Sequence, residues 1–275
     1  MPIKNIAKDW VPPAAIRFAR ALLDIIRTAP YEFSGYSWPH DIQLKGWQAA
    51  VQENREQVWQ GFVASLAGNG PLGVSERELR FPYHVNINLQ CLYLAFGYAL
   101  GLACDSKQEV SVLDWGGGTG NYYLVSKALM PETTFTYHCA DLPSACAYGR
   151  KLLPDVVFHE SDTWQGTKFD LVFSSSSLQY LEDWRPTVES LIKSSNRYLF
   201  ITRMPFVMTG ESFVMIQRAA CYGTEYLGWV LNRQEFIQFV EQQGMKLVRQ
   251  IVNHAGPRIK KAPELNLYMG FLFEK

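Results

Sequence analysis

The chain has 275 residues and is 48% hydrophobic, which allows one large domain, or one domain with an elaborate cap, around a sizeable core. The 26 Lys and Arg residues balance the 26 Asp and Glu residues, and a formal net charge of zero argues against a broad nucleic-acid-binding surface. The five cysteines include no C-x-x-C pair, which argues against a zinc cluster or a dithiol redox site and favours free thiols in a reducing cytoplasm.

The first 104 residues are expected to be mostly helical, with little strand signal. Residues 12–29 have the apolar spacing of an amphipathic helix packed on the protein, residues 42–68 predict one or two further helices, and residues 81–103 predict a largely apolar helix. Residues 31–40, YEFSGYSWPH, predict an aromatic-rich loop. No signal peptide is expected, and no segment approaches the ~20 apolar residues that span a bilayer, so stable membrane insertion is not expected.

From Glu109 onward the sequence alternates between short apolar strands and amphipathic helices, which predicts a parallel sheet covered on both faces. Asn232, three residues before Glu235, opens the last helix with a capping box, and Gly244 ends it. The last two strands have no clear helix between them and are expected to form an antiparallel hairpin at the sheet edge. The expected strands are residues 110–115, 134–141, 156–162, 169–177, 197–205, 245–252 and 265–274.

A turn with four glycines follows the first of these strands. Asp114 ends the strand, and the turn contains Gly116, Gly117, Gly118 and Gly120. Glycine within regular structure costs stability, so this concentration indicates that a ligand approaches the backbone closely. In a doubly wound sheet, ligands bind beyond the carboxyl ends of the strands, where the strand order reverses. The glycine turn is therefore the predicted ligand site.

Two classes of ligand fit such a turn. A dinucleotide site would carry its third glycine at position 121 or 123, and these positions hold Asn121 and Tyr123. A nicotinamide dehydrogenase is therefore the less favoured alternative. The spacing D-x-G-x-G-x-G instead resembles the first motif of class I S-adenosylmethionine-dependent methyltransferases, and residues 169–184, FDLVFSSSSLQYLEDW, resemble their fourth motif. The resemblance implies a Rossmann-like α/β fold in residues 105–275, with a seven-stranded, mostly parallel sheet and a C-terminal antiparallel hairpin, preceded by a helical cap or lid in residues 1–104.

The cofactor implied by this resemblance is S-adenosylmethionine, and acidic residues at two strand ends match its ribose and adenine sites. Asp141, 21 residues after Gly120, lies where one carboxylate can accept from both ribose hydroxyls; the alternative is that it caps a helix beginning near Ser144. Asp162 is expected to accept from the adenine amine, and Thr163 and Trp164 stand beside it, with Trp164 as a candidate aromatic face for the adenine. The alternative is that Ser161 and Thr163 cap a helix. The full set of expected cofactor-binding residues is Asp114, Gly116, Gly117, Gly118, Gly120, Asn121, Asp141, Leu142, Ser161, Asp162, Thr163 and Ser175.

Methyl transfer to a hydroxyl benefits from a general base, and three residues are catalytic candidates: His84, Tyr180 and Glu182. Glu182 takes the place of the His in the HDW stretch of some small-molecule O-methyltransferases; the alternative is an exposed Glu at a helix start. His84 could come from a cap that closes over the site, or it could be structural. No paired carboxylates have persuasive metal-ligand spacing, so metal-independent transfer is expected.

Further residues are expected on the acceptor side of the site. Arg203, after the fifth strand, could bind a carboxylate or phosphate of the acceptor, or it could form a structural ion pair. The lid is expected to contribute Tyr36, Trp38 and Tyr83, together with His84, as lining residues.

The flanks of these motifs carry a closer resemblance that covers most of the chain. It is to a bacterial family of methyltransferases found among surface-polysaccharide biosynthesis genes, and it rests on FSGYSW, DWGGGTGNYY, SSSLQYLEDW, ITRMPF, SFVMIQRAACYGTEY and VLNRQEFI. It implies a cytoplasmic enzyme that methylates a small-molecule acceptor, by O-methylation of a sugar or a sugar-linked metabolite, with no nucleic-acid partner. The alternative is a protein that binds S-adenosylmethionine without transferase activity and acts as a regulator or partner.

Overall fold

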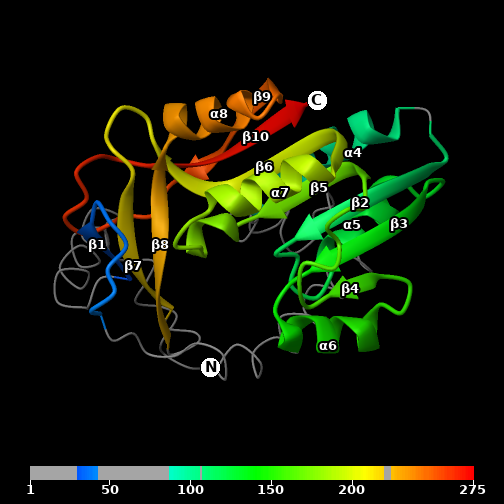
Figure 1. Ribbon diagram of the computed structural model, residues 1–275, viewed down its shortest axis with the longest axis horizontal. Coiled ribbons are helices and arrows are strands. Elements are labelled where there is room, and N and C mark those ends of the chain that lie inside the picture. The colour runs from blue at the N-terminus through cyan, green and yellow to red at the C-terminus, as the bar shows by residue number, and fades with distance from the viewer. Residues whose placement is uncertain (1–29, 43–86, 106, 220–223) are drawn as a thin grey trace, which may run out of the picture.

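The structure is a computed structural model that describes residues 30–42, 87–105, 107–219 and 224–275 (Figure 1). Within these residues, ten strands form a sheet in the order β1-β7-β8-β6-β5-β2-β3-β4, and β10 pairs with both β6 and β9. The candidate His84 lies outside the described residues.

Five parallel strands form the centre of the sheet, in the order β4-β3-β2-β5-β6. Their apolar runs suit strands that are covered on both faces. At one edge, β10 (Leu267–Glu274) pairs antiparallel with β6 and with β9 (Lys246–Ala255). The predicted α/β fold and its C-terminal hairpin are confirmed. The five central strands are β2 (Glu109–Trp115), β3 (Thr134–Ala140), β4 (Val157–His159), β5 (Phe169–Ser175) and β6 (Ser195–Val207).

Helices cover both faces of the central sheet. Along β2, Val112 packs with one core and Leu113 with the other, because successive side chains of a strand point to opposite faces. The last helix begins as predicted, since the Asn232 side chain accepts a hydrogen bond from the Glu235 N–H at 2.8 Å. One face carries α4 (Ile87–Cys104), α5 (Asn121–Leu129) and α6 (Pro143–Leu152), and the other carries α7 (Arg185–Ser194) and α8 (Arg233–Gln242).

Helix α4 is long and apolar enough to cross a membrane, judged by length and composition alone. In the structure it lies on the sheet, where Phe96, Ala99 and Leu100 are fully buried. The Phe96 ring packs 4.8 Å from the ring of Phe173 on β5. Packing in the core therefore accounts for the 44% of this helix that is buried, whereas Ile87 and Leu94 are exposed.

The loop predicted for residues 31–40 is wrong in its first half, because residues 31–35 form a strand. This strand, β1 (Tyr31–Gly35), pairs antiparallel with β7 (Phe213–Ala219), and the Phe33 ring packs 5.5 Å from Phe213. β1 has only five residues and is stabilised by pairing with a segment about 180 residues away. No local sequence pattern predicts this pairing.

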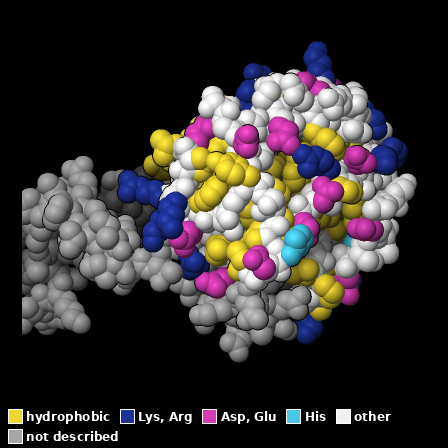
Figure 2. All heavy atoms as spheres, turned by 60° about the vertical axis from the view of Figure 1, so that its left-hand side comes forward, with side chains coloured by type: hydrophobic (Ala, Val, Ile, Leu, Met, Phe, Trp, Pro, Cys, Tyr) yellow, Lys and Arg dark blue, Asp and Glu magenta, His cyan; other side chains and the backbone are white. Residues whose placement is uncertain are grey.

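Strands β7 and β8 (Thr224–Asn232) form an antiparallel pair that extends the sheet beyond its predicted edge. They join the far end of β6, where Phe206 pairs with Leu231. Arg218 of β7 binds Glu32 of β1 at 3.1 Å and Glu225 of β8 at 3.0 Å. Figure 2 turns this side of the molecule forward, and hydrophobic side chains lie there between charged side chains of both signs.

Candidate functional site

The carboxyl ends of the central strands bring the predicted site to one edge of the sheet. From β2 the chain passes to β3 and β4 on one side, and then returns to β5 and β6 on the other side. The glycine turn follows β2, Asp141 follows β3, residues 160–163 follow β4, and Ser175 ends β5, with residues 176 and 177 directly after it. This reversal of strand order is the place where doubly wound sheets bind ligands.

The backbone of the glycine turn is anchored to the sheet and open on its outer side. The Gly116 N–H donates to the Ala140 carbonyl at 2.7 Å, and the Gly120 N–H donates to the Gly117 carbonyl at 3.0 Å. Gly116, Gly118 and Gly120 have left-handed φ values of 75°, 62° and 84°. A Cβ placed on Gly118 would meet no atom within 4 Å, so a ligand can reach the main chain there.

Asp114 lies directly against this turn, with only 1% of its surface exposed. A Cβ on Gly117 would collide with the Asp114 carboxylate, so the close approach requires glycine. Asp114 Oδ2 accepts from the Tyr137 hydroxyl at 3.0 Å. Asp114 Oδ1 is buried and has no hydrogen-bond partner among the described residues. Because a buried, unsatisfied acceptor costs about 1–3 kcal/mol, this oxygen favours a ligand that supplies a donor or a positive charge.

Burial raises the pKa of Asp114 to about 7; the hydrogen bond from Tyr137 lowers this pKa and the charge of Asp141 raises it further. In the unfolded chain an Asp has a pKa of about 3.9. Between these values the folded protein holds a proton that the unfolded protein releases. The stabilising contribution of that proton is present at low pH and is lost as the pH rises through about 7.

We expect Asp114→Asn to remove this pH dependence, because the amide is neutral at every pH. The variant should exceed the wild type in free energy of unfolding by about 4 kcal/mol at pH 8, and this advantage should fall to about 1.5 kcal/mol at pH 5. Urea unfolding of both proteins at pH 5, 6, 7 and 8 measures the difference. A difference that stays constant with pH would contradict the raised pKa of Asp114.

The Asp141 carboxylate is turned toward the glycine turn. Its Oδ2 accepts from the Gly118 N–H at 2.7 Å, and its Oδ1 accepts from the Leu142 N–H at 2.6 Å. The alternative role as a helix cap does not match the structure, because α6 begins at Pro143 with Leu142 as its N-cap and no side-chain cap bond. Asp141 is thus a half-buried acceptor beside the open face of Gly118.

The segment after β4 is an exposed turn beside Asp141. The Asp141 N–H donates to the His159 carbonyl at 3.2 Å, which ties the ends of β3 and β4 together. The side chains of Ser161 and Asp162 are exposed, and Thr163 Oγ1 lies 2.7 Å from His159 Nδ1. These three predicted residues therefore lie at the same sheet edge as the glycine turn.

The aromatic residue of this segment is not available to a ligand. Trp164 is 1% exposed and packs in the core with Leu113 and Phe169, so the expectation that it lies beside the adenine is wrong. No helix occurs in residues 160–168 of the described chain, and the Trp164 side chain packs in the core from this turn. Leu142, 36% exposed, is the apolar side chain next to Asp141 that remains on the surface.

The serine run after β5 supports the glycine turn from the other side. The Ser177 hydroxyl donates to the carbonyls of Gly116 and Ser175, both at 3.1 Å. Ser175 itself forms a hydrogen bond with the Tyr122 hydroxyl. Sequence reasoning singled out neither Ser177 nor Tyr137, because each acts through a contact with a distant segment; the run of four serines was the available signal for Ser177.

Tyr180, one of the catalytic candidates, lies in η3 (Leu178–Tyr180), directly after β5. Its hydroxyl donates to Gln217 Oε1 on β7 at 3.3 Å, and its ring packs edge to face on Tyr226 of β8 at 5.0 Å. Burial raises the pKa of Tyr180. The hydroxyl therefore keeps its proton at neutral pH and serves as a hydrogen-bond donor rather than a base.

Glu182 lies on the surface with 57% of its side chain exposed. Its Oε1 is 3.5 Å from His40 Nε2. The Trp229 indole N–H donates to the Glu182 carbonyl at 3.0 Å, and the Trp229 ring lies 5.9 Å from Trp38. Trp38, predicted as a lid residue, is thus near Glu182, whereas the Tyr36 side chain is 54% exposed.

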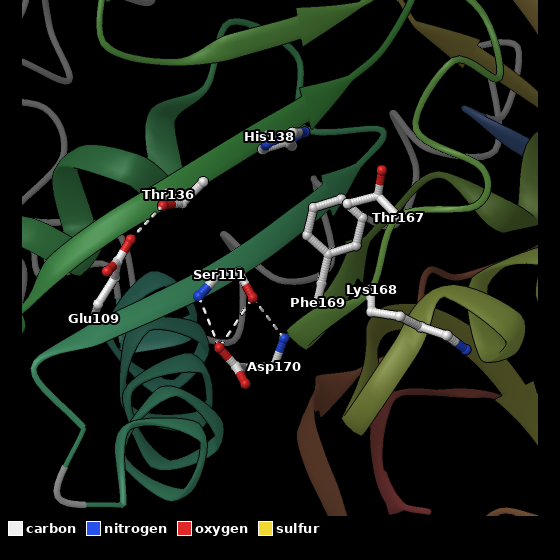
Figure 3. A pocket seen from close by; sticks show the side chains of 8 residues that line it. All are labelled: Glu109, Ser111, Thr136, His138, Thr167, Lys168, Phe169 and Asp170. Carbon is white, nitrogen blue, oxygen red and sulfur yellow. Dashed lines mark hydrogen bonds between the residues drawn. The ribbon is translucent and has the colours of Figure 1, made fainter.

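A cavity of about 320 Å³ lies at the opposite, amino ends of the strands (Figure 3). Asp170, in its wall, accepts from Lys107 Nζ at 2.6 Å and from the N–H and hydroxyl of Ser111, both at 2.9 Å. Burial alone would raise the pKa of Asp170, but these hydrogen bonds hold it below its usual value. The Asp170 carboxylate therefore has its hydrogen-bond partners within the protein. It lies at the opposite ends of the strands from the glycine turn.

No protein-family model matches the chain, and no curated protein matches it. Among solved structures, a magnesium protoporphyrin IX methyltransferase from Synechocystis is similar at 12% identity and a TM-score of 0.48, over 83% of this chain and 99% of that chain. An amino pentose methyltransferase from Micromonospora echinaspora is similar at 15% identity and a TM-score of 0.43, over 73% of this chain and 98% of that chain. A methyltransferase from Clostridium acetobutylicum is similar at 12% identity and a TM-score of 0.46, over 79% of this chain and 98% of that chain. These likenesses are too distant to transfer a substrate or a residue role.

Proposed function

We propose that this protein is an S-adenosylmethionine-dependent methyltransferase that methylates a hydroxyl of a small molecule, a sugar or sugar-linked metabolite. The observation that carries the proposal is the open glycine turn at Gly118, whose N–H is bound by the Asp141 carboxylate. The turn after β2 thus offers main chain that no side chain covers, and the end of the neighbouring strand β3 offers the Asp141 carboxylate.

The residues present fit this cofactor chemically. Asp141 can exchange the Gly118 N–H for the two vicinal ribose hydroxyls while remaining half-buried. The exposed Leu142 side chain offers an apolar face next to it, and Asp162 and Thr163 offer polar atoms for an adenine. The buried Asp114 carboxyl has no cation beside it among the described residues, which suits a cofactor that carries positive charge near the turn.

When bound, S-adenosylmethionine supplies a methyl group on a sulfonium; the carbon–sulfur bond breaks as the acceptor oxygen–carbon bond forms, and the acceptor loses its proton. The protein holds the acceptor in line, which is where most of the rate gain arises. Tyr180 keeps its proton and can orient an acceptor oxygen by donating to it. Glu182, paired with His40, is the described candidate that can take up the proton, and His84 is the candidate outside the described residues.

Two measurements test the proposal. Isothermal titration with S-adenosylhomocysteine should show binding to the wild type, and transfer from methyl-labelled S-adenosylmethionine should label a hydroxyl in a panel of sugars and nucleotide sugars. Cofactor binding without transfer to any extract fraction would favour the binding protein without transferase activity. Binding of a nicotinamide dinucleotide with no binding of S-adenosylhomocysteine would overturn the proposal.

A further inference from the structure

Two neighbouring strands carry left-handed residues at the same level of the sheet. Ser175 of β5 pairs with Thr202 of β6, and the Ser176 N–H donates to the Thr202 carbonyl at 3.0 Å. The residues that follow, Ser176 and Arg203, have φ values of 59° and 56°. Left-handed conformations are unfavourable for residues with a Cβ, and they gather where function holds them in place.

Arg203 is held in this conformation by a bulge in the pairing of β6 with β10. The register shifts between Met269 and Phe271 of β10, so that Gly270 lies opposite the bulge. A Cβ on Gly270 would lie 2.5 Å from Thr202 Oγ1, so glycine is needed there. Thr202 and Met204 are each 1% exposed, whereas Arg203 between them is exposed. Bulges of this kind redirect a side chain.

Three tyrosines lie close enough to Arg203 for its positive charge to act on their hydroxyls. Burial raises the pKa of Tyr93 on α4, of Tyr122 on α5 (to about 12) and of Tyr268 on β10, and in each case the positive charge of Arg203 acts in the opposite direction. All three hydroxyls are therefore protonated at neutral pH, and those of Tyr122 and Tyr268 already form side-chain hydrogen bonds with Ser175 and Tyr31. The tyrosines lie on α4, α5 and β10, and Arg203 lies on β6.

The part of the chain that the structure describes places no ion-pairing carboxylate beside Arg203. Arg150, Arg185, Arg197 and Arg218 each form an ion pair with an Asp or Glu. For Arg203, no ion pair occurs among the residues that the structure describes, so the structural ion pair weighed from the sequence has no partner there. A redirected, exposed guanidinium that forms no ion pair suits the binding of an oxyanion.

We propose that Arg203 binds an oxyanion on the methyl acceptor, either a carboxylate or a phosphate. This inference rests on the proposed function for the identity of the ligand. The strand order supports the assignment, because ribose and adenine would lie over β3 and β4, on one side of β2. Arg203 lies on the other side, beyond β5, where the acceptor would meet the methyl group.

The test titrates the protein, saturated with S-adenosylhomocysteine, with inorganic phosphate and separately with acetate. We expect the wild type to bind one of these anions, which decides between phosphate and carboxylate, and Arg203→Gln to bind it about 10-fold or more weakly. The matched control is Arg249→Gln. Arg249 lies on β9, remote from the glycine turn, and donates to the Tyr98 hydroxyl at 3.4 Å. Its loss should leave anion binding unchanged.

Three results would overturn the inference: equal anion binding by the wild type and Arg203→Gln, binding of neither anion by the wild type, or an equal loss of S-adenosylhomocysteine and anion affinity in Arg203→Gln. The last result would assign Arg203 to the cofactor. If the wild type does not bind S-adenosylhomocysteine, the proposed function fails, and titration of the free protein with the two anions still decides the oxyanion site.

A second variant separates function from folding. Arg203→Gly relieves the left-handed conformation, so its melting temperature should equal or exceed that of the wild type, while its anion affinity falls about 10-fold or more. A lower melting temperature with unchanged anion binding would mean that Arg203 is retained for structural contacts, and would overturn the inference.

Discussion

Asp141→Ala is expected to lower the affinity for S-adenosylhomocysteine by about 100-fold, because two charge-assisted hydrogen bonds to the ribose hydroxyls are lost together. The carboxylate already lies in place, bound to the Gly118 N–H at 2.7 Å. Calorimetric titration of wild type and variant measures the change. Asp141→Asn should be intermediate, because the amide oxygen keeps one acceptor but loses the charge.

Asp155→Ala is the matched control for this loss. Asp155 is an exposed carboxylate in the turn that leads into β4, at the amino end of that strand rather than the carboxyl end. Its removal should leave the affinity within about two-fold of the wild type, since it makes the same change in net charge without touching the site. An Asp141→Ala variant that binds as tightly as this control would refute the ribose role.

The second large effect concerns stability at Gly117. Gly117→Ala is expected to lower the free energy of unfolding by about 3 kcal/mol, because the new methyl group would collide with the buried Asp114 carboxylate. The backbone of the turn is tied to β3 through the Ala140 carbonyl and cannot move aside freely. Urea unfolding at fixed pH gives the difference directly.

Gly118→Ala supplies the comparison, because the same methyl group meets no atom there. Its left-handed φ of 62° makes alanine unfavourable by only about 1 kcal/mol. The variant should therefore fold and yet bind S-adenosylhomocysteine at least 10-fold more weakly, since the methyl group covers the open main chain. Wild-type affinity in Gly118→Ala would show that no ligand lies against this face.

Features governed by neighbouring residues were predictable from the sequence. The apolar runs predicted the central strands, and the Asn232–Glu235 spacing predicted the start of α8. The glycine turn with Asp114 predicted where the candidate site lies. Each depends on a period, a cap or a turn within a few residues. Asp141 belongs to this group too, because parallel strands must end at a common edge.

The tertiary structure alone decided the features that depend on distant segments. β1 exists because it pairs with β7, Trp164 is buried because it packs with Leu113 and Phe169 in the core, and Ser177 reaches the turn through the β2–β5 pairing. The left-handed Arg203 likewise follows from the bulge opposite Gly270. Burial, hydrogen-bond partners and backbone strain are set by the packing of elements that lie far apart in the chain. Composition and local residue spacing do not predict that packing.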